Sequence, residues 1–145
     1  MTIFNRVLAP LRPAARVLTG STYILLGLDA VRQPGKRVEL AGPVLSAIRG
    51  RVPLPEDDEL LVRANAGVQV AAGGILALGL APRLSAAVLA ASLVPTTLAG
   101  HPYWTIEDPA ERNQQRIHFH KNLALIGGLL LAVLDKPDSQ PLTTG

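Results

Sequence analysis

Long apolar stretches alternate with charged connections along this chain. Residues 64–82 carry no formal charge over 19 positions, and residues 84–106 carry none over 23. A helix needs about 20 mostly apolar residues to cross the hydrocarbon of a bilayer. Two further stretches are marginal, because their flanking charges must reach back to the headgroups on long side chains. The pattern predicts four membrane-spanning helices, at about residues 12–31, 60–80, 84–100 and 117–134.

The connections between these stretches differ in length. A tight turn joins the second and third, with Gly79 as a helix stop and Pro82 as a restart. Residues 32–59 form a longer connection with apolar side chains at i, i+3, i+4 and i+7, namely Ala41, Val44, Leu45 and Ile48. This spacing predicts a short amphipathic helix, which either lies in the membrane interface or serves as an ordinary connector.

A capping box marks the start of the last helix. Asp108 is followed by Pro109 and Glu111, which places an acid at the N-cap, proline at the first helical position and glutamate at N3. The helix should begin at Pro109 and run to about Leu134. We therefore expect an all-α fold, an integral membrane four-helix bundle in one domain of residues 1–135, with a disordered polar tail at residues 136–145.

Composition narrows the class of protein. The chain has 145 residues, of which 48% are hydrophobic, so the alternative to a membrane protein is a soluble helical bundle rich in alanine and leucine. The net charge of +3 does not indicate nucleic acid, since aromatic residues make up 3% and the basic residues lie in the connections. Arginines at the membrane boundary explain this charge better.

The residues present argue against cysteine-based sites and against a histidine metal site. The chain contains no cysteine, which excludes disulfides, thiolate nucleophiles and cysteine-based metal centres. His118 and His120 are two positions apart on a helix, point in nearly opposite directions and cannot chelate one ion. No metal site and no catalytic residue is predicted.

Polar residues enter the apolar stretches in two helical stripes. Glu111, Gln115, His118 and Asn122 share one face of the last helix, and Asp58, Asn65 and Gln69 share one face of the second. Four spans would bring both stripes to the same membrane face. The polar ends of the first and third spans would lie at that face too. The sequence therefore predicts one polar pocket built from Asp29, Asn65, Gln69, His101, Trp104, His118 and Asn122.

Structural explanations remain open for several of these residues. Asn65 and Gln69 are also consistent with hydrogen bonds across helices, and Trp104 with an interfacial aromatic belt. Asp29 is consistent with a salt bridge to Arg63 or Lys121. Glycines within the spans are predicted close-packing positions, namely Gly67, Gly73, Gly74, Gly127 and Gly128.

Two segments carry a family resemblance. LGLAPRLSAAVLAASLVPTTLAGHPYW and DPAERNQQRIHFHKNLALIGGLLLAVLD resemble the DoxX family of small four-span bacterial membrane proteins, over about residues 10–135. The resemblance implies a multi-pass protein of the bacterial plasma membrane. Its motif positions add Lys121 to the candidates and include His101, Trp104, His118 and Asn122. His120 departs from the family pattern.

The resemblance also implies a set of functions. Relatives include the membrane subunit of a thiosulfate:quinone oxidoreductase, and mycobacterial members link a superoxide dismutase to a sulfurtransferase. We expect a membrane anchor or scaffold for a redox complex, with no intrinsic cofactor and no activity of its own. The alternative is a quinone-binding subunit. A small-solute transporter ranks last, because residues 71–80 and 123–134 offer no polar path. Self-association and membrane orientation stay open.

Overall fold

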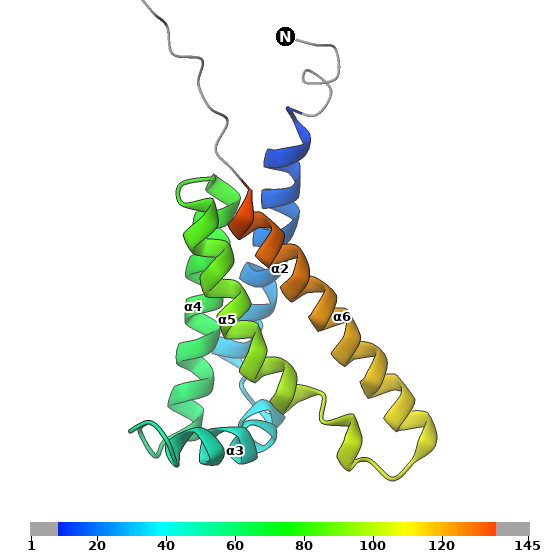
Figure 1. The fold of residues 1–145 in the computed structure, drawn as a ribbon. Coiled ribbons are helices and arrows are strands. Elements are labelled where there is room, and N and C mark those ends of the chain that lie inside the picture. Colours follow the sequence, from blue (N-terminus) through cyan, green and yellow to red (C-terminus); the bar gives the residue numbers. More distant parts are fainter. Residues whose placement is uncertain (1–8, 136–145) are drawn as a thin grey trace, which may run out of the picture.

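The computed structural model describes residues 9–135. All regular secondary structure in this part of the chain is helical (Figure 1). The predicted polar tail at residues 136–145 lies outside the described residues. The elements in chain order are α2 (Leu11–Arg32), α3 (Lys36–Arg49), α4 (Asp58–Leu78), α5 (Pro82–Gly100), the short 3-10 helix η1 (Tyr103–Thr105) and α6 (Pro109–Leu134).

Local sequence signals set the helix ends. The side chain of Asp108 accepts a hydrogen bond from the Glu111 N–H at 2.7 Å, with Pro109 in the first turn, as the capping box predicts. α4 ends at Gly79, whose φ of +71° lies in the left-handed region that glycine adopts without strain. Asp57 caps the start of α4 by accepting from the Leu60 N–H at 2.9 Å. Each predicted span therefore coincides with a helix.

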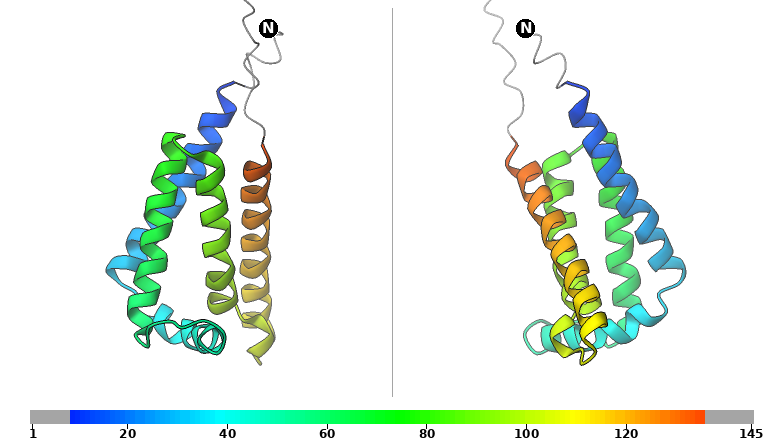
Figure 2. Two further views of the ribbon diagram at one scale, coloured as in Figure 1. Left: turned by 60° about the vertical axis from the view of Figure 1, so that its left-hand side comes forward. Right: turned by 90° about the vertical axis from the view of Figure 1, so that its right-hand side faces the viewer.

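The four long helices run alternately up and down, and each packs against the next in the order α2, α4, α5, α6 (Figures 1 and 2). The start of α2, the α4–α5 turn and the end of α6 lie together at what we call the hairpin end. α3, η1 and the start of α6 lie at the opposite end, the platform end. This arrangement places both ends of the described chain on the same side of the molecule.

The long helices form an open row, so the expected all-α fold is confirmed but the four-helix bundle is not. α6 packs against α5 and η1 and diverges from α2 and α4 toward the platform end (Figure 1). Leu129 is the one buried residue of α6. Apolar residues surround the C-terminal half of this helix, so lipid can cover the faces that protein leaves open.

Three segments of the described chain are long and apolar enough to cross a membrane, namely Asp58–Leu78, Pro82–Thr105 and Pro109–Leu134. α2 is not among them. It carries Arg16 and Asp29 inside its length, which lowers its mean hydropathy.

Glycines bring α2 and α4 into close contact. A Cβ built on Gly20 would lie 2.3 Å from the backbone oxygen of Gly73, and one built on Gly27 would lie 2.9 Å from that of Ala66. The prediction of close packing holds for Gly73, where a Cβ would lie 2.8 Å from the Gly20 oxygen. It is not met for the other four glycines, for which such a Cβ has no neighbour within 4 Å among residues 9–135, namely Gly67, Gly74, Gly127 and Gly128.

α3 lies across the platform ends of α4 and α5 (Figure 1). Its predicted apolar residues are half-buried: Ala41, Val44, Leu45 and Ile48. The amphipathic pattern thus faces other helices of the protein, as expected for a connector. A position in the membrane interface stays a prediction.

The core lies between α2, α4 and α5 and includes Tyr23, Leu76, Leu89 and Leu93, with Leu129 from α6. The Tyr23 hydroxyl is buried and has no hydrogen-bond partner within the described chain. A buried polar group without a partner costs about 1–3 kcal/mol relative to one that remains hydrated.

Replacing Tyr23 with phenylalanine should therefore raise the free energy of unfolding by about 1–3 kcal/mol, because the ring stays and the unpaired hydroxyl goes. Thermal unfolding of the purified protein in mild detergent measures this. Tyr103→Phe is the matched control, since it alters the only other tyrosine, which is less buried. A loss of stability in Tyr23→Phe would show that the hydroxyl has a partner in the folded protein.

Candidate functional site

The predicted site residues fall into three groups at the platform end. Asp29 lies at the α2–α3 corner, Asn65 and Gln69 lie between α4 and α5, and His101 with His118 lies between α5 and α6. We treat the histidine group first, because it contains most of the candidates.

His101 and His118 stack on one another at the junction of α5 and α6. Their ring centroids lie 5.3 Å apart, and the planes meet at 21°. The Nδ1 atom of His101 lies 2.7 Å from Oε1 of Gln115. An amide oxygen only accepts hydrogen bonds, so His101 donates from Nδ1, and its Nε2 remains available. His118 makes no hydrogen bond within residues 9–135 and is half-buried.

An aromatic set lies beside the histidine pair. Tyr103 and Trp104 of η1 meet Phe119 of α6 edge-to-face, with centroid distances of 5.4 and 5.8 Å. Tyr103 and Trp104 also meet each other at 5.2 Å. Edge-to-face aromatic pairs stabilise a contact by about 0.5–1.5 kcal/mol beyond their buried area. These rings hold η1 against α6, while Trp104 keeps 54% of its surface exposed.

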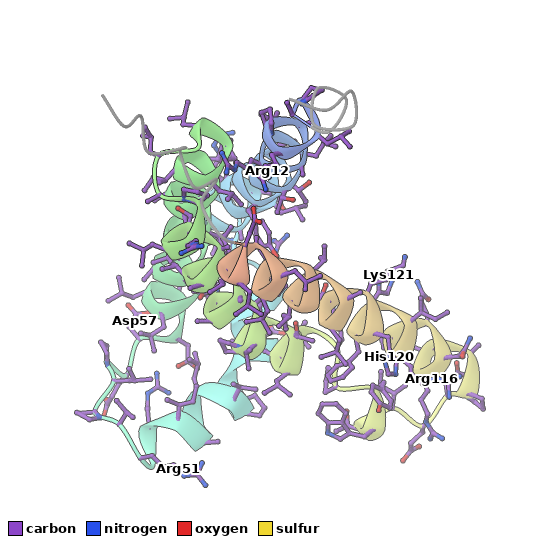
Figure 3. All side chains as sticks on the ribbon, turned by 45° about the horizontal axis from the view of Figure 1, so that its top comes forward. Arg12, Arg51, Asp57, Arg116, His120 and Lys121 are labelled. Atoms are coloured by element: carbon purple, nitrogen blue, oxygen red, sulfur yellow. The ribbon has the colours of Figure 1, made fainter. Side chains whose placement is uncertain are left out.

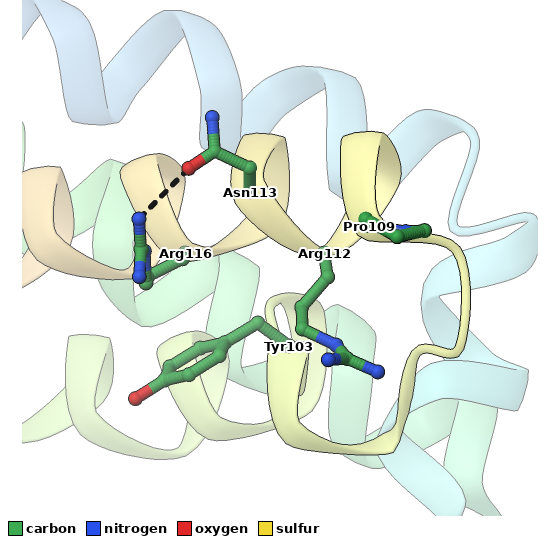
Figure 4. Close-up of a pocket in the computed structure, with 5 residues that line it drawn as sticks. All are labelled: Tyr103, Pro109, Arg112, Asn113 and Arg116. Carbon is green, nitrogen blue, oxygen red and sulfur yellow. Dashed lines mark hydrogen bonds between the residues drawn. The ribbon is translucent and has the colours of Figure 1, made fainter.

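A shallow hollow opens next to η1. Its volume is about 280 Å³, and it is lined by Tyr103, Pro109, Arg112, Asn113 and Arg116 (Figure 4). The Arg112 guanidinium donates to the Ile106 carbonyl at 2.6 Å and so braces the connection into α6. Arg116 donates to the Asn113 side-chain oxygen at 2.9 Å. The hollow therefore presents positive charge on an aromatic floor.

The second group is a hydrogen-bonded network between α4 and α5. Ser92 donates to Asn65 Oδ1 at 2.8 Å, while Asn65 donates to Thr96 at 3.1 Å. Gln69 donates to Ser92 at 3.0 Å and contacts Thr96 at 3.4 Å. The structural explanation considered for Asn65 and Gln69 is confirmed, since both bond across the helix interface.

The third group corrects an expectation about Asp29. Its carboxylate lies 2.7 Å from the Arg37 guanidinium of α3, and not against Arg63 or Lys121. Arg63 instead pairs with Glu59 at 2.8 Å and donates to the Val31 carbonyl. Asp29 meets Arg37 because α3 begins only four residues after the end of α2, which places the first turn of α3 next to the last turn of α2.

The stripe predicted on α6 is half-buried over part of its length. Gln115, His118 and Asn122 are half-buried, whereas Glu111 at its start is exposed. Lys121 is exposed and points away from the other helices (Figure 3). Lys121 and Asn122 make no side-chain hydrogen bond within the part of the chain that the structure describes.

One shared pocket does not form from these groups. Asn65 and Gln69 were expected opposite the α6 stripe, but α5 lies between α4 and α6 (Figure 2). Asn65 and Gln69 therefore bond to Ser92 and Thr96 of α5, and not to residues of α6 as expected. The four-residue spacing of Ser92 and Thr96 matches that of Asn65 and Gln69, and this is the signal that sequence reasoning overlooked.

Chemically, the platform end offers imidazole nitrogens, an amide, two guanidinium groups and an indole at the boundary of the apolar helices. This set can bind an anion, a polar carbonyl compound or an acidic protein surface. Within residues 9–135 no group of three histidine or carboxylate side chains is placed to hold a metal ion.

Comparison with known proteins supports the resemblance. A family model described as DoxX matches residues 12–102, which include α2 to α5 together with Asp29, Asn65, Gln69 and His101. Trp104 and the α6 candidates lie beyond the matched range. Neither a search of curated proteins nor one of solved structures returned a match. Because the match spans more than half of the chain and its helices are apolar, this multi-pass membrane protein belongs to the DoxX family.

Proposed function

We propose that this protein is a membrane anchor that docks a soluble redox enzyme at its platform end. The proposal rests on the arrangement of helices and polar residues at that end. α3, residues 50–57, η1 and the first two turns of α6 lie at the same end of the molecule, and together we call them the polar platform (Figure 1).

α6 is longer than the hydrocarbon core of a bilayer is thick, so part of the platform would lie outside that core. At 1.5 Å per residue its 26 residues extend about 39 Å, compared with about 30 Å for the core of a bilayer. The first two turns, which carry Arg112 and Arg116, would therefore stand in the headgroup layer or beyond it. A soluble partner could reach them there.

Charged side chains of the platform are exposed in a way that suits a polar partner. Arg51, Asp57 and Arg116 project from separate corners of this end (Figure 3). Arg116 bonds to the neutral Asn113 amide, so its charge is not neutralised by a carboxylate within the described residues. Charges at an interface rim govern encounter and specificity.

The polar groups deeper in the protein mostly bond to one another. Asn65, Gln69, Ser92 and Thr96 form a closed set, and His101 is bonded to Gln115. Such bonds fix the relative positions of α4, α5 and α6 and so give the platform a rigid base. A rigid base for a polar surface is what an anchor subunit requires.

We further propose that α2 is a fourth span and that the protein lies in the bacterial plasma membrane. α2 has 22 residues, so the helix is about 33 Å long. It packs along α4, itself long and apolar enough to span, through Gly20 and Gly27. Its charged residues lie toward its two ends, at the depth of the headgroups.

The family suggests which partners to test. On that resemblance, the docked enzyme would be a superoxide dismutase or a sulfurtransferase of a redox complex. Purification of the tagged protein from its bacterial host in mild detergent should recover one of them at near-stoichiometric level. Recovery of neither enzyme would contradict the anchor function.

Paired charge reversals locate the docking surface. Arg51→Glu combined with Arg116→Glu should lower recovery of the partner at least about tenfold, equivalent to about 1.4 kcal/mol, because both alter the platform rim. The matched control compares the single reversals Arg116→Glu and Arg16→Glu, since Arg83 must stay intact to hold the end of α6 through the Asp135 carbonyl. Equal losses from these two single variants would argue against docking at the platform.

A quinone site is the second candidate function, and the His118 imidazole is the observation in its favour. This ring is half-buried, stacked on His101 and without a hydrogen bond within the described chain. A quinone carbonyl needs such a donor beside an apolar surface. Extraction of the same purified protein and assay for menaquinone or ubiquinone distinguishes the two functions. A stoichiometric quinone that is lost in His118→Phe would favour the second.

A further inference from the structure

A second hollow lies at the hairpin end, remote from the platform. Its volume is about 700 Å³, within the range of ligand-binding pockets. The start of α2, the α4–α5 turn and the end of α6 enclose it. Three arginines line it, Arg12, Arg16 and Arg83, together with Asp135 and apolar side chains that include Leu76 and Ala132.

Positive charge exceeds negative charge in this hollow. Arg12 lies 3.6 Å from the Asp135 carboxylate. Arg83 donates from Nε to the Asp135 backbone carbonyl at 2.6 Å, which leaves its charge without a counter-ion there. Arg16 contacts no carboxylate within residues 9–135 and reaches toward Gly79, at the C-terminal end of α4. Within the described residues, Arg16 and Arg83 therefore have no carboxylate partner, while Asp135 pairs with Arg12.

Fixed positive charge at this end of the molecule suits a bound anion, although Arg12 and Arg83 are exposed and Arg16 is half-buried. Guanidinium groups stay protonated at all accessible pH values, so their charge cannot be removed by titration. They lie where the long helices end, at the boundary between hydrocarbon and water. Unpaired charge is costly near a bilayer, and basic pockets between spanning helices take anionic lipid headgroups.

Apolar walls distinguish this hollow from a simple ion site. Leu76 of α4, Leu84 of α5 and Ala132 of α6 line the hollow together with the arginines. α6 diverges from α2 beyond this point (Figure 2), and the end of α6 carries the exposed leucines Leu130 and Leu131. An acyl chain can follow this open side, while a phosphate group occupies the charged top.

We propose that the hollow at the hairpin end binds an anionic phospholipid, with its phosphodiester held by Arg16 and Arg83 and an acyl chain laid against the apolar wall. Arginine suits this role because its planar fork donates two parallel hydrogen bonds to phosphate oxygens. The lipid would bridge α2 and α6, which pack only weakly on each other.

Native mass spectrometry of the full-length protein with added lipids tests the proposal. Phosphatidylglycerol should bind at least tenfold more tightly than phosphatidylcholine, and one molecule per chain should survive detergent removal. Arg16→Gln should weaken phosphatidylglycerol binding about tenfold, since one charge-assisted pair is lost. Arg16→Gln with Arg83→Gln should abolish the preference for the anionic lipid.

The matched control removes the same charge from the other end. Arg51→Gln with Arg116→Gln should leave lipid binding unchanged. Because Arg83 also holds the end of α6, the single Arg16→Gln variant keeps the test independent of folding. Equal binding of the two lipids, equal loss in the control pair, or complete competition by inorganic phosphate at millimolar concentration would overturn the proposal.

Discussion

Replacing Gly20 with alanine is expected to destabilise the protein by about 1–3 kcal/mol, the range for overpacking a tightly packed site. The added methyl group would lie 2.3 Å from the Gly73 oxygen and 2.8 Å from the Ala77 Cβ. Both neighbours belong to the α4 helix, and a backbone carbonyl cannot move aside like a flexible side chain. α2 and α4 must therefore separate, and their shared contacts weaken together.

Gly74→Ala is the matched control for this experiment. Gly74 lies on α4 beside Gly73, but a Cβ there meets nothing within 4 Å. Alanine is also favoured over glycine inside helices by about 0.5–1 kcal/mol, so the control should be neutral or slightly stabilising. Thermal unfolding in detergent, followed by size-exclusion chromatography, measures both. Similar unfolding temperatures for Gly20→Ala and Gly74→Ala would contradict the close α2–α4 packing.

Helix positions were predictable because local signals set them. The capping box at Asp108, the glycine stop at Gly79 and the apolar periodicity act within a few residues of where they are read. The same holds for α3, whose apolar spacing predicts a helix without knowledge of its neighbours. These features do not depend on how the helices pack.

Helix packing was less predictable, and the glycines illustrate why. Gly73 and Gly74 are adjacent, yet one meets α2 and the other faces open space. Sequence spacing identifies a face of a helix, but not which neighbour lies on that face. The i, i+7 spacing of Gly20 and Gly27 on α2 carried the missing information, because a partner helix must lie against that face.

The candidate site shows the same limit. Of the stripe predicted on α6, Gln115 and His118 contact His101, whereas Glu111 is exposed. The predicted neighbours of this stripe, Asn65 and Gln69, lie elsewhere, because the periodicity of α4 and α6 does not show that α5 lies between them. The salt bridge between Asp29 and Arg37 was likewise not predicted, because it depends on the direction in which α3 leaves the end of α2.

The membrane topology of the four long helices is the prediction whose test has two clearly separate outcomes. If α2 spans the membrane, the start of the described chain and the α4–α5 turn share one side, and the platform lies on the other. If α2 stays on the surface, the start of the chain joins the platform. The absence of native cysteines allows each position to be tested with a single introduced thiol.

Four exposed positions suit this test: Ala9, Leu80, Arg51 and Gln114. Each is replaced by cysteine in turn, and intact cells are treated with a membrane-impermeant maleimide. Lysed cells serve as the control, because all four thiols should react there. The stability of each variant is checked by its expression level in the membrane fraction.

The proposed four-span anchor requires the platform to face one compartment while both ends of the described chain, residues 9 and 135, face the other. The account predicts that Ala9→Cys and Leu80→Cys react alike in intact cells, and that Arg51→Cys and Gln114→Cys show the opposite behaviour. If Ala9→Cys instead reacts together with Arg51→Cys and Gln114→Cys, α2 does not cross the bilayer and the four-span anchor is contradicted.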